Sequence, residues 1–305
     1  MTPRRADATL LFACLLWGVS FVVVKLALES ASPLAFAAIR FGIATVVLAP
    51  FVRLEQRFTK SELLGGAVLS ALLGIGFLTQ TTGLQWTTPS RSAFLVAISS
   101  VLAPAIAAVA MRERPRRLLL VALALAGIGV FFLTAPDRGG LNRGDALTLI
   151  TAVLYGGHIV ATGVVARRFD PLRLVWLEIA GTTVLAALGA GLVEHPHVTW
   201  SPGFLGALAY TALGATVVTL LLQMKAQRHL SAARASVLFT GESLFAAITS
   251  WLVLDERLTS MQWLGGGLIL AGMVLAELKP SVLSNQPPAI QVELMPPPND
   301  ISAPG

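Results

Sequence analysis

Ten apolar runs, joined by short polar segments, follow one another along this chain. A helix needs about 20 apolar residues to cross the roughly 30 Å hydrocarbon core of a bilayer, and each run has about that length. Backbone groups in hydrocarbon must be hydrogen-bonded within the segment, which a helix achieves and irregular chain does not. The runs cover residues 8–28, 34–52, 63–84, 92–111, 118–135, 146–166, 174–193, 203–224, 235–254 and 261–278. The pattern therefore predicts an all-α integral membrane protein with ten transmembrane helices.

The composition favours a membrane protein over a soluble one. The chain has 305 residues and is 55% hydrophobic and 12% charged, whereas about a quarter of the residues in a soluble domain are charged. Its single cysteine, Cys14, lies inside an apolar run, so neither a disulfide framework nor a cysteine metal cluster is expected. The segment 280–305 differs, because its prolines lie among Ser, Asn and Gln. It is predicted to be a disordered cytoplasmic tail.

The positive charges indicate how the predicted helices are oriented. With the N-terminus in the cytoplasm, sixteen of the 22 Lys and Arg residues fall in cytoplasmic segments, five fall outside, and Arg40 lies within a span. Short cytoplasmic loops carry such an excess in membrane proteins. We therefore expect both termini on the cytoplasmic side of a cell inner (plasma) membrane. The net charge of +6 is assigned to this topology and not to nucleic-acid binding.

Residues 7–42 recur, with modest similarity, at residues 145–180. This alignment, called the first register, has no gap and gives eight identities in 36 positions. The landmarks keep their order: an acidic start, an aromatic residue before Gly, a Pro after the first span, and an ionisable residue seven positions later. The pairs are Asp7 with Asp145, Trp17-Gly18 with Tyr155-Gly156, Pro33 with Pro171, and Arg40 with Glu178. We interpret this order as an internal repeat.

A second register, offset slightly from the first, extends the repeat. It pairs Arg91 with Arg234, Glu113-Arg114 with Glu256-Arg257, and Gly129 with Gly272. Five predicted helices precede the second copy, so the two copies enter the membrane from opposite sides. Inverted repeats of this kind are a recurrent plan of secondary transporters. We predict one five-helix repeat over residues 7–135, a second, inverted one over residues 145–279, and the tail over residues 280–305.

Several short motifs resemble those of one transporter family. They are Leu16-Trp17-Gly18 with Ser20, Phe21 and Lys25; Pro33 and Arg40-Phe41; Glu113-Arg114 and Glu256-Arg257; and Glu242 to Ala247, in which Ser243 stands where the family usually has Pro. Over about residues 7–279 the chain resembles an EamA-type transporter of the drug/metabolite transporter superfamily, with YddG-like amino-acid exporters among the relatives. The resemblance implies a ten-helix fold and the efflux or exchange of small metabolites.

Arg40 and Glu178 are ionisable residues seven positions into predicted spans. Each lies roughly 10 Å from the membrane face where its helix begins, because a helix rises about 1.5 Å per residue. Inversion makes those faces opposite and leaves on the order of 10 Å between the two in depth. A direct ion pair is therefore not required. We treat both as structural or gating charges, since charges at such depth face a cavity or a partner; the alternative is that each tethers neighbouring helices.

Glu242 lies near the middle of its predicted span, where a carboxylate is most costly. It is our strongest single candidate for a functional side chain. It could bind a substrate amine or carry a coupling proton. The alternative is a protonated Glu that is hydrogen-bonded to a neighbouring helix.

Tyr155, His158 and Thr162 share one helix face, because they are spaced by three and four residues. The repeat pairs Tyr155 with Trp17 and His158 with Ser20. The two aromatic residues thus fall at mid-depth on equivalent helices, where they could flank a central cavity. A largely apolar cavity with few polar groups is the usual small-molecule site. The alternative is plain packing, which is the commoner role of a buried aromatic side chain.

Two further polar residues complete the candidate substrate site. Gln80 and Tyr210 lie within spans, where their polar groups need partners. His195 and His197 have no cluster of further ligands around them in the sequence, so an outer loop is expected there and no metal site. Gly265-Gly266-Gly267 is not followed by the Gly-Lys-Ser/Thr of a phosphate loop, and close helix approach explains it better. No cofactor is expected.

These observations predict a secondary transporter, not an enzyme, that exports or exchanges a small solute such as an amino acid by alternating access. Without a phosphate loop, uphill transport needs a proton or an exchanged solute. The alternative is a polytopic membrane enzyme acting on a lipid-linked substrate, with His158 and Glu242 as acid and base. Against the enzyme, no motif places a nucleophile beside a base.

Overall fold

The chain is all-helical in the computed structural model, which describes residues 3–52, 57–134, 140–165, 168–227 and 232–277. The α-helices are α1 (Pro3–Ala27), α2 (Pro33–Leu48), α3 (Lys60–Gly83), α4 (Pro89–Ala97), α5 (Ser99–Ala110), α6 (Arg117–Leu133), α7 (Arg143–Val165), α8 (Pro171–Leu192), α9 (Pro202–Ala209), α10 (Thr219–Gln227), α11 (Ala232–Leu254) and α12 (Ser260–Glu277). A short 3₁₀ helix, η1 (Ala49–Phe51), follows α2, and a π-helical segment, η3 (Tyr210–Val218), joins α9 to α10.

Every predicted apolar run lies in a helical segment, within a few residues at each end. Seven helical segments are long and apolar enough to cross a membrane, and three shorter apolar helices accompany them among the described residues. Prolines set several of the starts: Pro33, Pro89, Pro171 and Pro202 each stand in the first turn of a helix. A proline is favoured there because its missing N–H group has no partner within the helix. The predicted tail, residues 280–305, lies outside the described residues.

One transmembrane segment is interrupted and its counterpart in the second register is not. The segment Pro89–Ala110 consists of α4 and α5, which meet at Ile98. The equivalent helix, α11, runs from Ala232 to Leu254 without a break. This fits the presence of Ser243 in place of a proline, because a proline inside a helix removes a hydrogen bond and bends the chain.

The two Glu-Arg motifs each follow a residue with left-handed backbone conformation. Arg112 (φ 56°) comes just after α5, and Asp255 (φ 50°) comes just after α11. They precede Glu113 and Glu256, and the second register pairs them. A left-handed residue is a common way to end a helix, so both motifs mark helix ends of the same kind.

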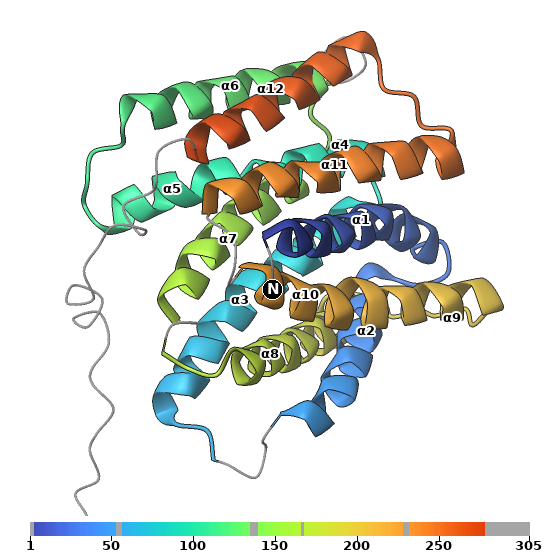
Figure 1. Ribbon diagram of the computed structural model, residues 1–305. Helices are drawn as coiled ribbons and strands as arrows, with labels where there is room; N and C mark the ends of the chain where they lie inside the picture. Colours follow the sequence, from blue (N-terminus) through green and yellow to red (C-terminus); the bar gives the residue numbers. More distant parts are fainter. Residues whose placement is uncertain (1–2, 53–56, 135–139, 166–167, 228–231, 278–305) are drawn as a thin grey trace, which may run out of the picture.

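The helices pack as pairs across the whole sequence (Figure 1). At one edge α6 lies along α12; next to them α4 lies beside α11, and α5 packs on α7. Helix α1 packs on α11 and α10, while α3 packs on both α7 and α8, and α2 on α8. Helices that are distant in the sequence therefore form the bundle, so a cavity in it is bounded by both halves of the chain.

Glycines allow the closest of these approaches. A Cβ atom on Gly129 would stand 2.7 Å from the carbonyl oxygen of Gly265, where α6 crosses α12. A Cβ atom on Gly272 would stand 2.8 Å from the carbonyl oxygen of Ala122, in the same helix pair. Small residues let two helix backbones approach in this way.

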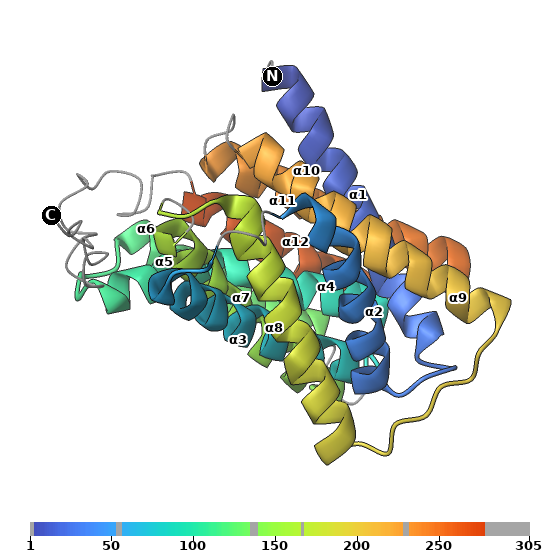
Figure 2. The same cartoon turned by 90° about the horizontal axis from the view of Figure 1, so that it is seen from below.

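The connection from α8 to α9 forms a loop at the edge of the bundle (Figure 2). It is held by main-chain hydrogen bonds, with Ser32 N donating to His197 O (3.1 Å) and Thr199 N to Ser30 O (2.7 Å). The Glu194 carboxylate accepts from Leu34 N (3.1 Å) at the start of α2. The expected loop at the two histidines is thus observed, and no group of side chains able to hold a metal occurs among the described residues.

Candidate functional site

A cavity of about 330 Å³ lies in the middle of the bundle. Its walls come from α1 to α5, α7, α11 and α12, together with η3 and α10, and thus from both halves of the chain. Aromatic rings and aliphatic side chains make up most of the lining, with a few polar groups among them. The polar and charged lining residues are Trp17, Ser20, Arg40, Gln80, Thr81, Ser99, Ser100, Tyr155, His158, Thr216, Gln223, Glu242 and Ser243.

The structure brings most of the predicted site residues together on this cavity. Six of the seven predicted substrate-binding residues line it, as does Arg40. Tyr210 is the exception: its hydroxyl donates to the carbonyl oxygen of Leu16 (2.7 Å), so it joins α1 to η3 outside the lining. Glu178 also stands behind the wall. Tyr210 is therefore omitted from the site considered below.

Trp17 and Tyr155, paired by the repeat, both line the cavity. The Trp17 indole nitrogen donates to the carbonyl oxygen of Ala215 (3.0 Å), which fixes the ring against the π-helical segment. The Tyr155 hydroxyl donates to Gln80 Oε1 (3.0 Å). Each ring therefore offers its faces to the cavity while its polar tip is held by the protein, which suits a site for an apolar group.

Gly76 gives the Tyr155 ring its space. A Cβ atom at Gly76 would lie 2.5 Å from Cε1 of Tyr155, closer than any packing allows. The Tyr155 ring also meets the edge of Phe77 at a centroid distance of 5.6 Å. Helix α3 thus sets the position of an aromatic wall that belongs to α7.

His158 and Glu178 are in hydrogen-bonding contact across α7 and α8. Nε2 of His158 contacts Oε1 of Glu178, and Thr162 Oγ1 lies 3.4 Å from the same nitrogen. Glu178 is 5% exposed and is not among the lining residues, whereas His158 reaches the cavity. The imidazole therefore stands between the cavity and the buried carboxylate.

Arg40 is buried in α2 and contacts the cavity from the first half of the chain. Its Nε donates to Thr216 Oγ1 (3.1 Å). The guanidinium lies over the rings of Phe41 and Phe77, at 5.1 and 5.2 Å from the ring centroids. Cation–π contacts of this kind hold an Arg in an apolar wall. Neither a hydrogen bond nor an ion pair joins Arg40 to Glu178: Arg40 is bonded to Thr216, and Glu178 contacts His158.

Glu242 reaches the cavity from α11. Neither a hydrogen bond nor an ion pair of its carboxylate occurs among the described residues. Beside it, Ser243 donates its hydroxyl to the carbonyl oxygen of Ala93 (3.0 Å), which ties α11 to α4. The helix at Glu242 is therefore firmly placed while the carboxylate itself remains available to a ligand.

Comparison with known families accounts for this arrangement. The sequence profile of the EamA-like transporter family matches residues 4–135 and again residues 142–278. The chain belongs to the EamA-like transporter family. The prediction of an all-helical, multi-pass membrane transporter is thereby confirmed.

Individual relatives of this EamA chain are transporters by name. It is 32% identical over 274 residues to an uncharacterised transporter of Archaeoglobus fulgidus, covering 90% of this chain and 86% of the relative. It is 26% identical to the uncharacterised inner membrane transporter YicL of Salmonella typhimurium, covering 91% and 96%. A crystal structure of a protein with 17% identity overlays 91% of this chain and 98% of that one with a TM-score of 0.64, which shows a shared fold.

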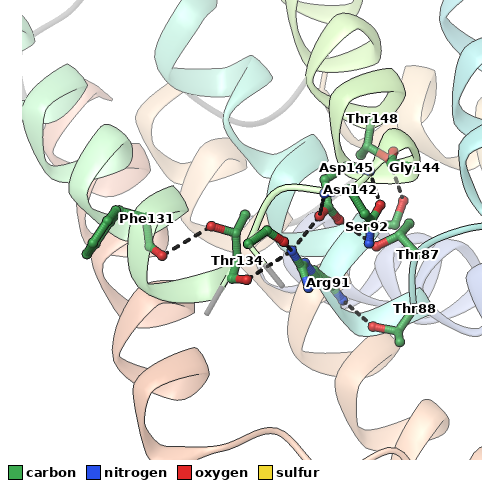
Figure 3. A network of polar contacts seen from close by, with 11 residues as sticks. Thr87, Thr88, Arg91, Ser92, Phe131, Thr134, Asn142, Gly144, Asp145 and Thr148 are labelled. Carbon is green, nitrogen blue, oxygen red and sulfur yellow. Dashed lines mark hydrogen bonds and ion pairs between the residues drawn. The ribbon is translucent and has the colours of Figure 1, made fainter. Parts of the chain in front are cut away.

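One end of the EamA bundle is joined by a polar network around Arg91 and Asp145 (Figure 3). Arg91, on α4, forms an ion pair with Asp145, on α7, whose side chain is fully buried. The same Arg91 nitrogen donates to the carbonyl oxygen of Thr134 (3.1 Å), just after α6. Asp145 also accepts from the hydroxyl of Thr87 (2.6 Å). Three helix ends and the turn before α4 are thus connected at a single point.

Glu256 makes a second connection at this end. Its carboxylate accepts from the Ser90 hydroxyl (2.8 Å) and backbone N–H (3.3 Å) at the start of α4, and from the Ser250 hydroxyl. Lys25 adds a third, by donating to the carbonyl oxygens of Leu84 and of Thr87. The ends of α1, α3 and α11 are thereby joined to the start of α4.

The opposite end carries a different ion pair. Arg173 Nε donates to Glu62 Oε1 (3.0 Å), and the guanidinium lies 4.1 Å from the centroid of the Phe58 ring. Glu62 also completes a capping box with Thr59 at the start of α3. These contacts join the start of α3 to the start of α8.

The ion pair of Arg91 with Asp145 was not predicted from the sequence. Both residues were landmarks of the repeat, but Asp145 belonged to the first register and Arg91 to the second. The signal that could have found them is their charge, since opposite charges near the starts of two helices at the same face of the membrane are candidates to pair. Phe77 and Thr216 were missed because nothing in the sequence relates them to Arg40.

Proposed function

We propose that the protein is a secondary transporter that exports or exchanges small metabolites such as amino acids by alternating access. The observation that carries the proposal is the cavity. It is bounded by both halves of the chain and contains ionisable side chains from predicted membrane spans, where such groups commonly serve transport. The family and the names of the relatives agree with a transporter, while the solute and the direction are our proposal.

The two halves are proposed to be inverted repeats over residues 7–135 and 145–279. The family profile matches twice, in corresponding places. Left-handed residues at 112 and 255 end equivalent helices. The glycine contacts also occur in equivalent pairs: the second register exchanges Gly129 with Gly272 and Ala122 with Gly265. A two-fold relation within the membrane plane would produce such paired contacts.

We further propose that the connected end, around Arg91 and Glu256, faces the outside, and that both termini are cytoplasmic in an inner membrane. The excess of Lys and Arg on the other loops supports this orientation. One relative bears the name of an inner membrane transporter. In this orientation the structure corresponds to a state closed towards the outside. Release to the outside would require the contacts of Arg91, Glu256 and Lys25 to separate.

Solute counterflow in proteoliposomes tests the transport function. Vesicles that contain the purified protein are loaded with an unlabelled amino acid, and uptake of the labelled one is followed; metabolite amines and acids are tested in the same way. A carrier accumulates the label transiently and returns the solute unchanged. Conversion of the solute would favour the membrane enzyme with His158 and Glu242 as acid and base. No counterflow with any solute class would contradict the proposal.

A substitution at Glu242 tests whether the cavity is the transport site. Glu242→Gln keeps the shape of the side chain and removes its charge. We expect folded protein, judged by size-exclusion profile and thermal unfolding, with strongly reduced counterflow. Glu29→Gln, which changes an exposed carboxylate outside the cavity, serves as the control. Equal activity of both variants would remove Glu242 from the mechanism.

A further inference from the structure

Two opposite charges face the cavity without a protein partner for their ligand-binding atoms. Arg40 comes from α2 and Glu242 from α11. No ion pair joins them to each other or to another described residue. Charges in an apolar environment are stabilised by pairing, so both groups are suited to a ligand that supplies the missing partners.

Arg40 presents an incompletely used guanidinium. Nε is satisfied by Thr216, and the rings of Phe41 and Phe77 hold the plane of the group. The two terminal nitrogens form no hydrogen bond with a described residue. Among the described residues, the buried side-chain nitrogen and oxygen atoms that lack a hydrogen-bond partner do not include any atom of Arg40. The two terminal nitrogens of Arg40 therefore adjoin open space. A planar fork of donors in such a position matches a carboxylate.

Glu242 presents the complementary group. Its oxygens likewise adjoin open space, because they are not among the enclosed unpartnered atoms of the described residues. The backbone around it is fixed by the contact of Gly18 with α11 and by the Ser243 hydrogen bond. A carboxylate that is free and well placed is suited to accept from an ammonium group.

The other ionisable lining residues, His158 and Tyr155, do not compete for these roles, since the Tyr155 hydroxyl is neutral and donates to Gln80 (3.0 Å). The His158 nitrogen is in contact with Glu178, which compensates the imidazole from behind the wall. Among the described lining residues, the remaining charged groups are therefore one cation, Arg40, and one anion, Glu242. A substrate with a single charge would leave the other pole unpaired, whereas a zwitterion pairs both.

We propose that the cavity selects a zwitterion, whose carboxylate binds Arg40 and whose ammonium group binds Glu242. The aromatic walls, Trp17, Phe77, Tyr155 and Phe239, would surround its apolar part. The volume of about 330 Å³ suits a solute of amino-acid size. This proposal rests on the proposed transport function and adds to it the chemical class of the solute and the residues that read its two charges.

Matched ligand sets test the two-pole recognition on the purified protein in detergent. One set is L-phenylalanine with 2-phenylethylamine, which lacks the carboxylate, and 3-phenylpropionate, which lacks the amine. A second is L-leucine with 3-methylbutylamine and 4-methylpentanoate. 4-Aminobutyrate and 6-aminohexanoate vary the distance between the charges. Binding is measured by calorimetry, and at least one zwitterion is expected to bind about tenfold or more tightly than its one-charge analogues.

Variants show which residue binds the carboxylate of the zwitterion and which binds its ammonium group. Glu242→Gln should lower the affinity for the zwitterion to about that of its acid analogue, and should leave the affinity for the acid unchanged. Arg40→Gln should lower the affinity for the zwitterion to about that of its amine analogue, and should leave the affinity for the amine unchanged. Arg40→Lys retains the charge but not the fork, and should recover part of the binding; it also provides a folded variant if Arg40→Gln unfolds. Glu29→Gln should bind as the wild type does.

Three results would overturn the proposal. They are an amine or acid that binds as tightly as the matched zwitterion, a Glu242→Gln variant that weakens acid and zwitterion equally, and a panel in which no zwitterion binds. Counterflow separates this failure from that of the transport function. Exchange of an amine or an acid alone would leave a transporter with different recognition. If a zwitterion binds through both charged groups but no solute is exchanged, the proposed recognition stands and the proposed transport function is contradicted.

Discussion

Gly18 of α1 lies directly against Glu242 of α11. A Cβ atom on Gly18 would stand 2.7 Å from the Glu242 carbonyl oxygen and 2.7 Å from Cβ of Phe245. The glycine of the aromatic-Gly motif therefore positions the backbone that carries the cavity carboxylate. In the second half, a Cβ atom on Gly156 would stand 3.2 Å from the carbonyl oxygen of Ser99, and the second register pairs Ser99 with Glu242.

The first prediction concerns this close approach. Gly18→Ala should destabilise the protein by roughly 1–3 kcal/mol, because the added methyl group meets backbone atoms that cannot move independently. Thermal unfolding in detergent measures the effect. Gly127→Ala is the control, since a Cβ atom there meets nothing within 4 Å among the described residues. Similar unfolding temperatures for the two variants would contradict the packing described here.

The second prediction concerns the fully buried Asp145. Asp145→Asn leaves the charge of Arg91 uncompensated and should cost about 3 kcal/mol of unfolding free energy, as is usual when one partner of a buried ion pair is removed. Asp255→Asn is the matched control, because its pair with Arg257 is 77% exposed on both sides and such pairs contribute little. Chemical unfolding followed by tryptophan fluorescence measures both. A loss of the same size in both would show that burial of the pair is unimportant.

The third prediction concerns pH. If the coupling ion is a proton, the titratable groups at the cavity are His158 with Glu178 behind it, Glu242, and Tyr155, with Arg40 as a fixed charge. His158 is an imidazole at the cavity that contacts the buried Glu178 carboxylate, and imidazoles commonly carry protons in proteins. His158→Gln removes this group and should flatten the pH profile of counterflow, while binding of a solute at constant pH persists. A profile that is the same in the variant would assign any proton dependence to another group.

The fourth prediction separates cavity shape from stability. Gly76→Ala would push the Tyr155 ring, whose Cε1 would lie 2.5 Å from the new methyl group. We expect the ring to move into the cavity and the affinity for a bound solute to fall about tenfold or more, because tight pockets tolerate little added volume. Calorimetry with the ligand sets above measures this. Tyr155→Ala removes the clash together with part of the cavity wall, so the double variant Gly76→Ala/Tyr155→Ala should bind a solute as Tyr155→Ala alone does. A further loss in the double variant would point to a different cause.

Much of the fold could be predicted from the sequence, because long apolar runs in a membrane protein leave few alternatives to helices. The helix starts at Pro33 and Pro171 were visible for the same local reason. The internal repeat, which pairs Trp17 with Tyr155, also indicated that these two side chains lie at the same depth. These features depend on local chemistry or on chain order, which a sequence contains explicitly.

The partners of the charged residues could not be predicted. Depth along a helix placed Arg40 and Glu178 in the membrane, but the rotation of each helix about its axis decides which neighbours they meet. The structure gives Arg40 the Thr216 hydroxyl and two rings, and gives Glu178 the imidazole of His158. Tyr210 illustrates the same limit, since its hydroxyl turns to α1 and not to the cavity.

The crossing of α6 and α12 has a consequence for how such a bundle could move. Gly129 meets Gly265, and Gly272 meets Ala122, so an exchange of the two halves maps this helix pair onto itself. If each half adopts the conformation of the other during transport, contacts of this kind stay the same. In the inverted repeat that we propose, this pair would stay in place while the bundle opens and closes. The movement would then fall on helices such as α1, α4, α7 and α11, where the related approaches of Gly18 to Glu242 and of Gly156 to Ser99 are unequally close.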